Sequence, residues 1–269
     1  MSVEHPPRRI ALVTDFGDGP YVGQVQLVLS ALAPAVPCVP LVSDLVPFRP
    51  DLAAYLLPGL MRRMPTATLF LCVVDPGVGG ARDVLAADLL DGRWLVGPDN
   101  GLLEPCLRRA ERARVYRALW RPAELSDSFH GRDLFAPIAA AIVSGSLPES
   151  QAIDRERLVG SDWPDALAKI CYVDRYGNLL TGLPADELTP GCRFTINGFD
   201  VGPARTFCEV PPGRPFWYRN AFGLAEIAVS QGRADRLLGL SPGDALPPAI
   251  SPRAEAPGRP PTTRRSRSR

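Results

Sequence analysis

The sequence predicts an α/β protein with two domains: an N-terminal α/β domain whose sheet is mostly parallel or mixed, and a smaller C-terminal all-β, barrel-like domain. In the first half of the chain, apolar strand-like runs alternate with apolar residues at helical spacing. In the second half, short strand-like segments are separated by turn residues. A polar stretch rich in Gly, Pro and Ser lies between the two patterns.

The N-terminal half predicts a βαβαβ order, which favours parallel strands covered by helices. Here we expect strands at 9–14, 37–42, 69–74 and 114–119, and helices at 21–33, 50–64 with Pro58 inside, 102–109 and 134–143. Strands at 84–90 and 93–96 flank Asp91-Gly92, a strong hairpin signal.

The C-terminal half predicts six short strands and one short helix. We expect the strands at 169–173, 179–181, 193–196, 199–201, 206–210 and 224–229, and the helix at 234–238. These patterns divide the chain into an α/β domain at 8–148, a linker at 149–166, a β domain at 167–248 and an Arg-rich tail at 251–269.

Composition limits the class of protein. Hydrophobic residues make up 46% of the 269, and no apolar run approaches the roughly 20 residues of a membrane span. The first residues lack the apolar core of a secretion signal, so we expect a cytoplasmic protein without membrane contact. The six cysteines are scattered, which favours reduced, buried thiols.

Positive charge is concentrated in the tail. Residues 251–269 hold six arginines and one glutamate, and the remaining body has 24 basic and 28 acidic residues. This tail is polar and Pro-rich, so we expect disorder. Because the body shows no basic patch with interleaved aromatics, a nucleic-acid partner is not expected.

Residues 69–82 form the first candidate site. Their buried strand ends at Asp75, and in open α/β sheets ligands bind at the carboxyl ends of the strands. Gly77, Gly79 and Gly80 follow, so the backbone can approach a small molecule before Arg82 ends the loop. Asp-Pro-Gly is also ordinary turn chemistry, so this stretch alone does not define a function.

Six motifs occur in a fixed order and together resemble the S-adenosyl-L-methionine hydrolase family, the adenosine-forming hydroxide adenosyltransferases related to the fluorinase and chlorinase. The resemblance covers about residues 10–246. Its motifs are Thr-Asp-Phe-Gly at 14–17, Tyr-Val-Gly-Gln at 21–24, Val-Asp-Pro-Gly-Val-Gly at 74–79, Val-Gly-Pro-Asp-Asn-Gly at 96–101, Phe-His-Gly-Arg-Asp at 129–133 and Asp-Arg-Tyr-Gly-Asn at 174–178.

The resemblance implies a homotrimer that binds substrate between neighbouring subunits. It also implies that Asp75, Arg82 and His130 form the family's Asp-Arg-His triad, which the halogenases lack. Gly131 likewise resembles the hydrolase form, where the fluorinase carries a serine that helps to hold halide. No metal and no cofactor are implied, because S-adenosylmethionine is the substrate and adenosine and methionine are the products.

The chemistry explains why a triad is needed. Attack at ribose C5′ releases methionine as a neutral thioether, so the leaving group needs no acid. Water is a poor nucleophile, however. A histidine, a carboxylate and an arginine around one water molecule could orient and activate it for in-line attack.

Further residues are assigned to the substrate by resemblance. Asp15 is expected to accept hydrogen bonds from the ribose diol, Asn178 to meet the adenine edge and Asp174 to contact the methionine ammonium. Stacking on adenine is expected from Tyr176, Trp217 and Phe222. Asn220 belongs to the same set, but Ala221 replaces a serine that family members commonly carry near the methionine carboxylate.

Two alternatives remain open. One is a halide-using adenosyltransferase, disfavoured by the triad and by Gly131. The other is a nucleoside-binding trimer with little turnover. A metal-dependent hydrolase that uses Asp15, Asp75, Asp99 and His130 is not supported, because these residues lack compact ligand spacing.

Overall fold

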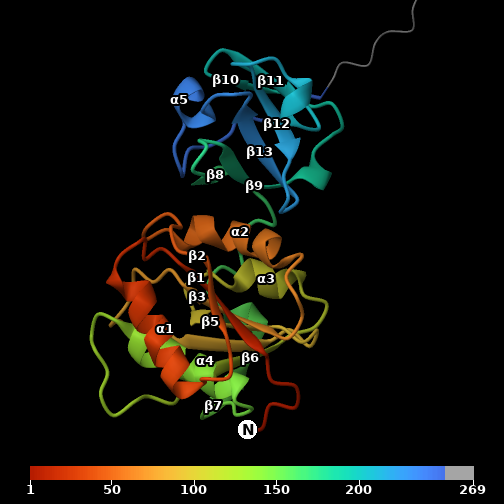
Figure 1. Cartoon of the computed structure of the whole chain (residues 1–269). Coiled ribbons are helices and arrows are strands. Elements are labelled where there is room, and N and C mark those ends of the chain that lie inside the picture. The colour runs from red at the N-terminus through yellow and green to blue at the C-terminus, as the bar shows by residue number, and fades with distance from the viewer. Residues whose placement is uncertain (252–269) are drawn as a thin grey trace, which may run out of the picture.

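The structure, a computed structural model, describes residues 1–251. It contains two sheets, one in each half of the chain, with α2 (Pro50–Met61) between them (Figure 1). The predicted fold class is confirmed. The expected tail at 251–269 lies outside the described residues apart from Ser251. No helix of the described part is long and apolar enough to cross a membrane, and the expected cytoplasmic location stays a prediction.

The N-terminal sheet has seven strands in the order β2-β1-β3-β5-β4-β6-β7. Strands β2, β1, β3 and β5 run parallel, and β4, β6 and β7 continue the sheet in antiparallel pairs. The strands are β1 (Arg9–Thr14), β2 (Cys38–Val42), β3 (Thr68–Val73), β4 (Val84–Asp88), β5 (Trp94–Pro98), β6 (Arg114–Ala118) and β7 (Ser150–Ile153).

Helices cover both faces of this sheet. On one face, α1 (Pro20–Leu32) and α4 (Ala136–Val143) pack together, and a π-helical turn, η1 (Gly131–Phe135), leads into α4. On the other face lie α2 (Pro50–Met61) and α3 (Glu104–Arg109) (Figure 1). Seven residues of α2 are buried, because the sheet lies on one side of it and strands of the C-terminal sheet contact its other side.

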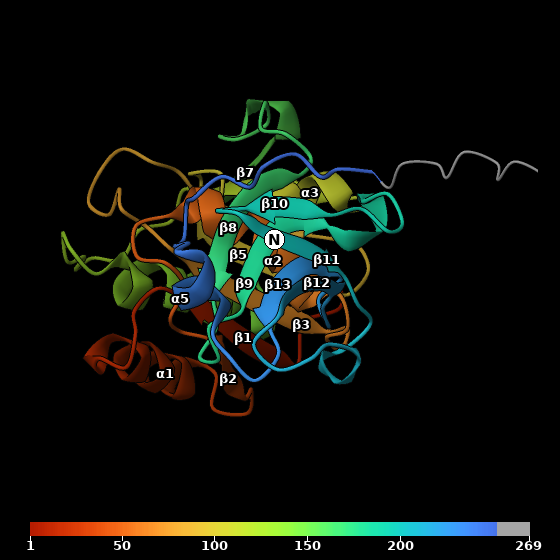
Figure 2. The same cartoon turned by 90° about the horizontal axis from the view of Figure 1, so that it is seen from above.

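The C-terminal sheet is a curled, open half-barrel of six strands that lies over α2 (Figure 2). Its order is β10-β11-β12-β13-β9-β8, and α5 (Ala234–Leu238) packs against β13. Its strands are β8 (Leu167–Val173), β9 (Leu179–Pro184), β10 (Phe194–Ile196), β11 (Phe199–Pro203), β12 (Pro215–Arg219) and β13 (Leu224–Val229), with 3₁₀ turns η3 (Ala185–Glu187) and η4 (Phe207–Glu209).

Two sequence-based expectations are wrong. The segment expected to be a strand at 206–210 contains the 3₁₀ turn η4 (Phe207–Glu209), and the strand lies instead at β12, after a Pro-rich segment that is typical of a turn. Pro215 is tolerated because it is the first residue of the strand. Within the expected linker, residues 150–153 form β7 at the edge of the N-terminal sheet, followed by the 3₁₀ turn η2 (Arg155–Arg157). A four-residue edge strand is too short to show periodicity.

The cysteine prediction is largely confirmed. All six thiols are free, and four are buried. Cys38 is half-buried, however, and Cys208 is exposed.

Candidate active site

Two acidic residues lie at the carboxyl ends of adjacent parallel strands. Asp15 follows β1 directly and Asp75 follows β3 by two residues, and the register pairs Thr14 with Val73. All six residues of β3 are buried, so the chain first becomes polar where the strand reaches the edge of the sheet. Burial raises the pKa of Asp15, and the nearby Asp75 adds to the rise.

Asp75 and Arg82 form a buried ion pair across the glycine loop. Nε of Arg82 donates to Oδ1 and Oδ2 of Asp75 at 3.1 and 2.9 Å, and Nη2 donates to Oδ2 at 2.5 Å. The two side chains are only 10% and 5% exposed. The Arg82 guanidinium also lies 5.1 Å from the centre of the Phe135 ring. This loop therefore holds a rigid charged pair.

His130 completes a hydrogen-bonded chain with that pair. It precedes η1 and is 6% exposed, and its Nδ1 lies 2.8 Å from Nη2 of Arg82. A guanidinium can only donate, so Nδ1 accepts and the ring proton is on Nε2. Burial, together with the charge of Arg82, lowers the pKa of His130. The imidazole is therefore neutral, with its Nε2–H free to donate.

The three predicted triad residues are thus brought together, but they do not play equivalent parts. Asp75, His130 and Asp15 line a cavity of about 400 Å³. Arg82 bonds to both Asp75 and His130 without lining the cavity. Arg82 is thus placed to hold Asp75 and His130 from behind, and not to line the cavity itself.

Phe48 is a cavity residue that the sequence analysis misses. Its N–H donates to Oδ2 of Asp15 at 3.0 Å, its φ is 62°, and its side chain is 73% exposed. A left-handed conformation is costly for an aromatic residue, so the surrounding structure must hold the backbone of Phe48 in place. Nothing in the sequence signals the positive φ.

A second cavity, of about 620 Å³, lies on the C-terminal sheet. Five of the predicted substrate-binding residues line it: Asp174, Tyr176, Asn178, Asn220 and Phe222. Tyr176 is 74% exposed, so its ring is available for stacking. The residues that line this cavity include two acids and no lysine, arginine or histidine, which favours a cationic ligand.

A compact turn fixes Asp174 and Asn178. Oδ1 of Asp174 accepts the N–H groups of Tyr176 and Asn178 at 2.8 and 2.9 Å, and Oδ2 accepts Nδ2 of Asn178 at 2.9 Å. Asn178 is 6% exposed, whereas Tyr176 extends outward. The turn thus presents one aromatic ring and holds two polar groups behind it.

Asn220 shapes a second turn. Its Oδ1 accepts the N–H groups of Phe222 and Leu224 at 2.9 and 3.0 Å, and its Nδ2 donates to Glu226 at 2.9 Å. Tyr218 donates its hydroxyl to the other oxygen of Glu226 at 2.6 Å. Since both ends of the Asn220 amide are used, this residue presents Phe222 rather than a free polar group.

Glu226 is a further residue that the sequence did not reveal. It lines the second cavity and is 5% exposed, and burial raises its pKa. Alternation along β13 gave no signal, because all six residues of that strand are buried.

Trp217 does not belong to the site. It is 7% exposed, donates Nε1–H to the carbonyl of Cys192 at 2.8 Å and packs edge-on against Phe194 in the C-terminal core. Neighbouring residues of a strand point to opposite faces. Because Tyr218 faces the cavity, Trp217 faces the core, and it leaves the set of binding candidates.

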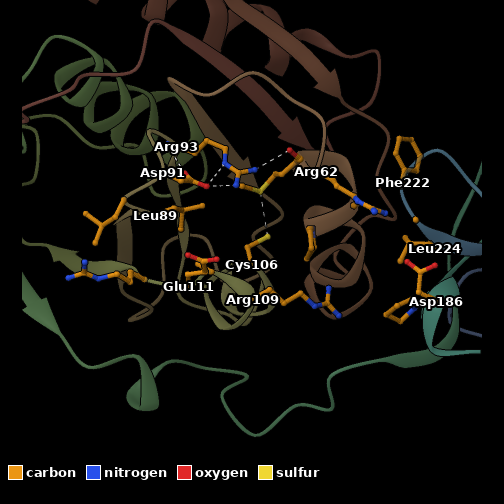
Figure 3. A pocket seen from close by; sticks show the side chains of 18 of the residues that line it. Arg62, Leu89, Asp91, Arg93, Cys106, Arg109, Glu111, Asp186, Phe222 and Leu224 are labelled. Atoms are coloured by element: carbon orange, nitrogen blue, oxygen red, sulfur yellow. Dashed lines mark hydrogen bonds and ion pairs between the residues drawn. The ribbon is translucent and has the colours of Figure 1, made fainter.

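A larger cavity, of about 710 Å³, lies between the N-terminal and C-terminal parts and shares Phe222 with the second cavity (Figure 3). Its wall carries the Asp91–Arg93 ion pair and a contact of 3.6 Å between the sulfurs of Cys106 and Met61. Of the predicted site residues, Phe222 alone lines it. Within residues 1–251, no three His, Cys, Asp or Glu side chains are placed to hold a metal ion.

Family models match both parts of the chain. Residues 10–152 match the N-terminal domain of SAM hydroxide adenosyltransferase, and residues 168–247 match its C-terminal domain. The chain is 38% identical to an (R)-S-adenosyl-L-methionine hydrolase of Thermus thermophilus, over 88% of this chain and 97% of that protein. It is 33% identical to a hydrolase of the same name from Salinispora tropica, over 90% and 97%.

Solved structures show the same fold. An uncharacterized conserved protein from Thermotoga maritima matches with a TM-score of 0.77 and 26% identity, over 88% of this chain and 98% of that one. A conserved hypothetical protein from Thermus thermophilus matches with a TM-score of 0.70 and 32% identity, over 89% and 97%.

Proposed function

The chain belongs to the SAM hydroxide adenosyltransferase family, and from this premise we propose that it hydrolyses S-adenosyl-L-methionine to adenosine and L-methionine. The resemblance in the sequence is thereby confirmed. The observation that carries the proposal is the chain of hydrogen bonds from Asp75 through Arg82 to His130 beside one cavity.

In the proposed reaction, one water molecule is held between Asp75 and His130. The Asp75 carboxylate accepts a hydrogen bond from the water, and the neutral His130 donates its Nε2–H to the water oxygen. Arg82 keeps both side chains in place, since its Nη2 bonds to each of them. This geometry orients a lone pair of the water toward C5′.

The step balances without a cofactor. The water oxygen bonds to C5′, the C5′–S bond breaks, and its electron pair neutralises the sulfonium. The protonated oxygen formed on C5′ is a strong acid, so even a carboxylate paired with an arginine is basic enough to take the proton. Solvent then removes it.

The substrate contacts come from both cavities. We propose that Asp15 binds the ribose diol, while Asp174, Tyr176, Asn178 and Phe222 bind the adenine and methionine ends. The two acids of the second cavity favour a substrate that carries a sulfonium and an ammonium.

We also propose a homotrimer with the active site between subunits. No residue lines both the His130 cavity and the Asp174 cavity, so each subunit offers two separate half-sites. Joining the first half-site of one subunit to the second half-site of its neighbour would enclose the substrate. The resemblance to the family implies the same arrangement.

Gly131 argues against a halide-using enzyme. A Cβ atom at this position would lie 3.1 Å from the Phe16 ring and 3.2 Å from the Phe129 ring. A serine would require these rings to shift by a few tenths of an ångström, which disfavours the halide-holding serine of the fluorinase at this position.

The proposal is tested by assaying the two separated sulfonium epimers of S-adenosylmethionine in heavy-oxygen water. The names of the relatives specify the (R) epimer, and we propose the same preference for this chain. Mass spectrometry should find the label in the 5′-hydroxyl of adenosine, formed faster from the (R) epimer. Methionine release without labelled adenosine, or equal rates from both epimers, would contradict the corresponding part of the proposal.

Two variants test the role of His130. His130→Gln can place an N–H near the former Nε2, whereas His130→Ala cannot. We expect His130→Ala to lower kcat by about 100-fold or more and His130→Gln to retain more activity. Equal activity of His130→Ala and wild type would reject the proposed mechanism.

A further inference from the structure

The loop after β5 lies beside both ends of the segment that carries Asp75 and Arg82. Strand β5 is parallel to β3, which leads into Asp75, and antiparallel to β4, which begins after Arg82. The polar loop Asp99-Asn100-Gly101 therefore emerges where β3 ends and β4 begins.

Two hydrogen bonds connect this loop to the catalytic segment. Nδ2 of Asn100 donates to the carbonyl of Val74 at 2.9 Å, and the N–H of Asp99 donates to the carbonyl of Asp83 at 3.0 Å. Val74 directly precedes Asp75, and Asp83 directly follows Arg82. The loop thus holds the segment at both ends.

The loop is itself fixed in place. Oδ1 of Asn100 accepts the N–H of Leu102 at 3.2 Å, and Oδ1 of Asp99 accepts the N–H of Val159 at 3.1 Å. Gly101 has φ 91°, and a Cβ atom there would clash with the Trp163 ring. Because both ends of the Asn100 amide are bonded, its direction is set.

We propose that Asn100 is a positioning residue for the hydrolysis, because its amide fixes the Val74 carbonyl and through it the direction of the Asp75 side chain. This inference rests on the proposed function. Asp75 is bonded to Arg82 and Arg82 to His130, so a shift at Val74 displaces the whole chain of hydrogen bonds. Asn100 lines neither the His130 cavity nor the Asp174 cavity, so its effect on the reaction passes through Val74 and Asp75.

The variant Asn100→Asp tests the donated hydrogen bond alone. It keeps the oxygen that accepts the Leu102 N–H and replaces the donor with a carboxylate oxygen, which repels the Val74 carbonyl. Since displacements near 1 Å can cost about 100-fold in rate, we expect kcat to fall by about 10- to 100-fold. KM should change by less than about threefold, because no binding group is removed.

Asn197→Asp is the matched control. Asn197 also donates Nδ2 to a carbonyl, that of Leu238 at 2.7 Å, but it lies in the turn between β10 and β11. The same chemical change should lower thermal stability while leaving kcat unchanged. An equal loss of kcat in both variants would reduce the role of Asn100 to general stability and overturn the proposal.

Nitrogen NMR of His130 gives a readout that does not depend on activity. In a His5→Gln background, His130 is the one histidine left in the sequence. Asn100→Asp should shift the Nδ1 signal, because the bond from Arg82 is disturbed, and Asn197→Asp should not. An unchanged His130 spectrum, or wild-type kcat in a folded Asn100→Asp, would overturn the proposal.

Two outcomes separate this inference from the proposed function. If wild type releases no adenosine but Asn100→Asp still shifts the His130 signal, the contact stands and the function fails. If Asn100→Asp does not fold, Asn100→Ser, with a shorter side chain, takes its place with the same readouts.

Discussion

Nη2 of Arg82 lies 2.8 Å from Nδ1 of His130, and this contact places the single ring proton of the neutral imidazole on Nε2. A protonated His130 would place two N–H donors face to face. The neutral ring instead accepts from the guanidinium and keeps its other nitrogen as a donor. One arginine thus holds the carboxylate of Asp75 and selects the tautomer of His130.

The first prediction concerns pH. Burial and Arg82 lower the pKa of His130 below its ordinary 6.5, so the folded protein resists protonation where the unfolded chain does not. The neutral ring therefore stabilises the fold fully above about pH 6.5, and this contribution is lost as pH falls toward the lowered pKa. We expect the acid limb of kcat/KM to lie below pH 6.5, as measured by rate profiles.

NMR titration supplies the control for this prediction. Arg82→Met removes a charge that disfavours the imidazolium, so the pKa of His130 should rise. Burial is the larger cause, so the value should stay below the ordinary one if the ring remains buried. A His130 pKa above 6.5 in wild type would contradict the assigned tautomer.

The second prediction concerns the buried ion pair. Asp75→Asn leaves the Arg82 guanidinium, 10% exposed, without its carboxylate. Breaking a buried pair in this way costs about 3–5 kcal/mol of unfolding free energy, and activity should fall as well. Urea denaturation measures the free-energy change.

Asp186→Asn is the control for that measurement. Asp186 pairs with Arg219 at 2.8 Å, but the two side chains are 69% and 45% exposed. Such exposed pairs contribute about 1 kcal/mol or less. If Asp75→Asn and Asp186→Asn lose the same unfolding free energy, the Arg82 guanidinium is not a buried charge that depends on Asp75.

The third prediction separates the ring of Phe48 from its backbone. Phe48→Ala keeps a side chain at φ 62° and removes the ring, whereas Phe48→Gly also removes the backbone strain. Both variants should raise KM if the exposed ring contacts substrate. The unfolding free energy of Phe48→Gly should be equal to that of Phe48→Ala or higher by up to about 1 kcal/mol. An unchanged KM in both would remove Phe48 from the site.

Much of the fold could be predicted because the apolar pattern is continuous where strands are buried. β3 is buried at all six positions, so its continuous apolar run predicts a strand, and Asp91-Gly92 predicts the hairpin between β4 and β5. The failures lie where burial is partial. β7 lies at a sheet edge and has no buried residue, since its two central residues are exposed and its two end residues are half-buried, and β12 starts within a Pro-rich segment.

The candidate site was predictable only in its residue identities. The motifs gave Asp75, Arg82 and His130, but not that Arg82 stands between the other two. The hydrogen-bond partners of Phe48 and Asn100 lie 33 and 26 residues away in the chain, so no local sequence pattern indicates either contact. Trp217 was misassigned because alternation on β12 depends on the strand, which the sequence did not reveal.

The fourth prediction tests whether the two cavities belong to different subunits of one site. His130→Ala damages the first half-site and Asn178→Ala damages the second, so each homotrimer should be nearly inactive. In mixed trimers, one interface joins the intact first half of one variant to the intact second half of the other. Co-expressing the two variants should therefore restore part of the wild-type kcat, with trimers verified by analytical ultracentrifugation.

Mixing purified homotrimers without subunit exchange is the control and should restore no activity. If co-expressed trimers stay as inactive as the parents, both half-sites act within one subunit, and the inter-subunit arrangement is rejected.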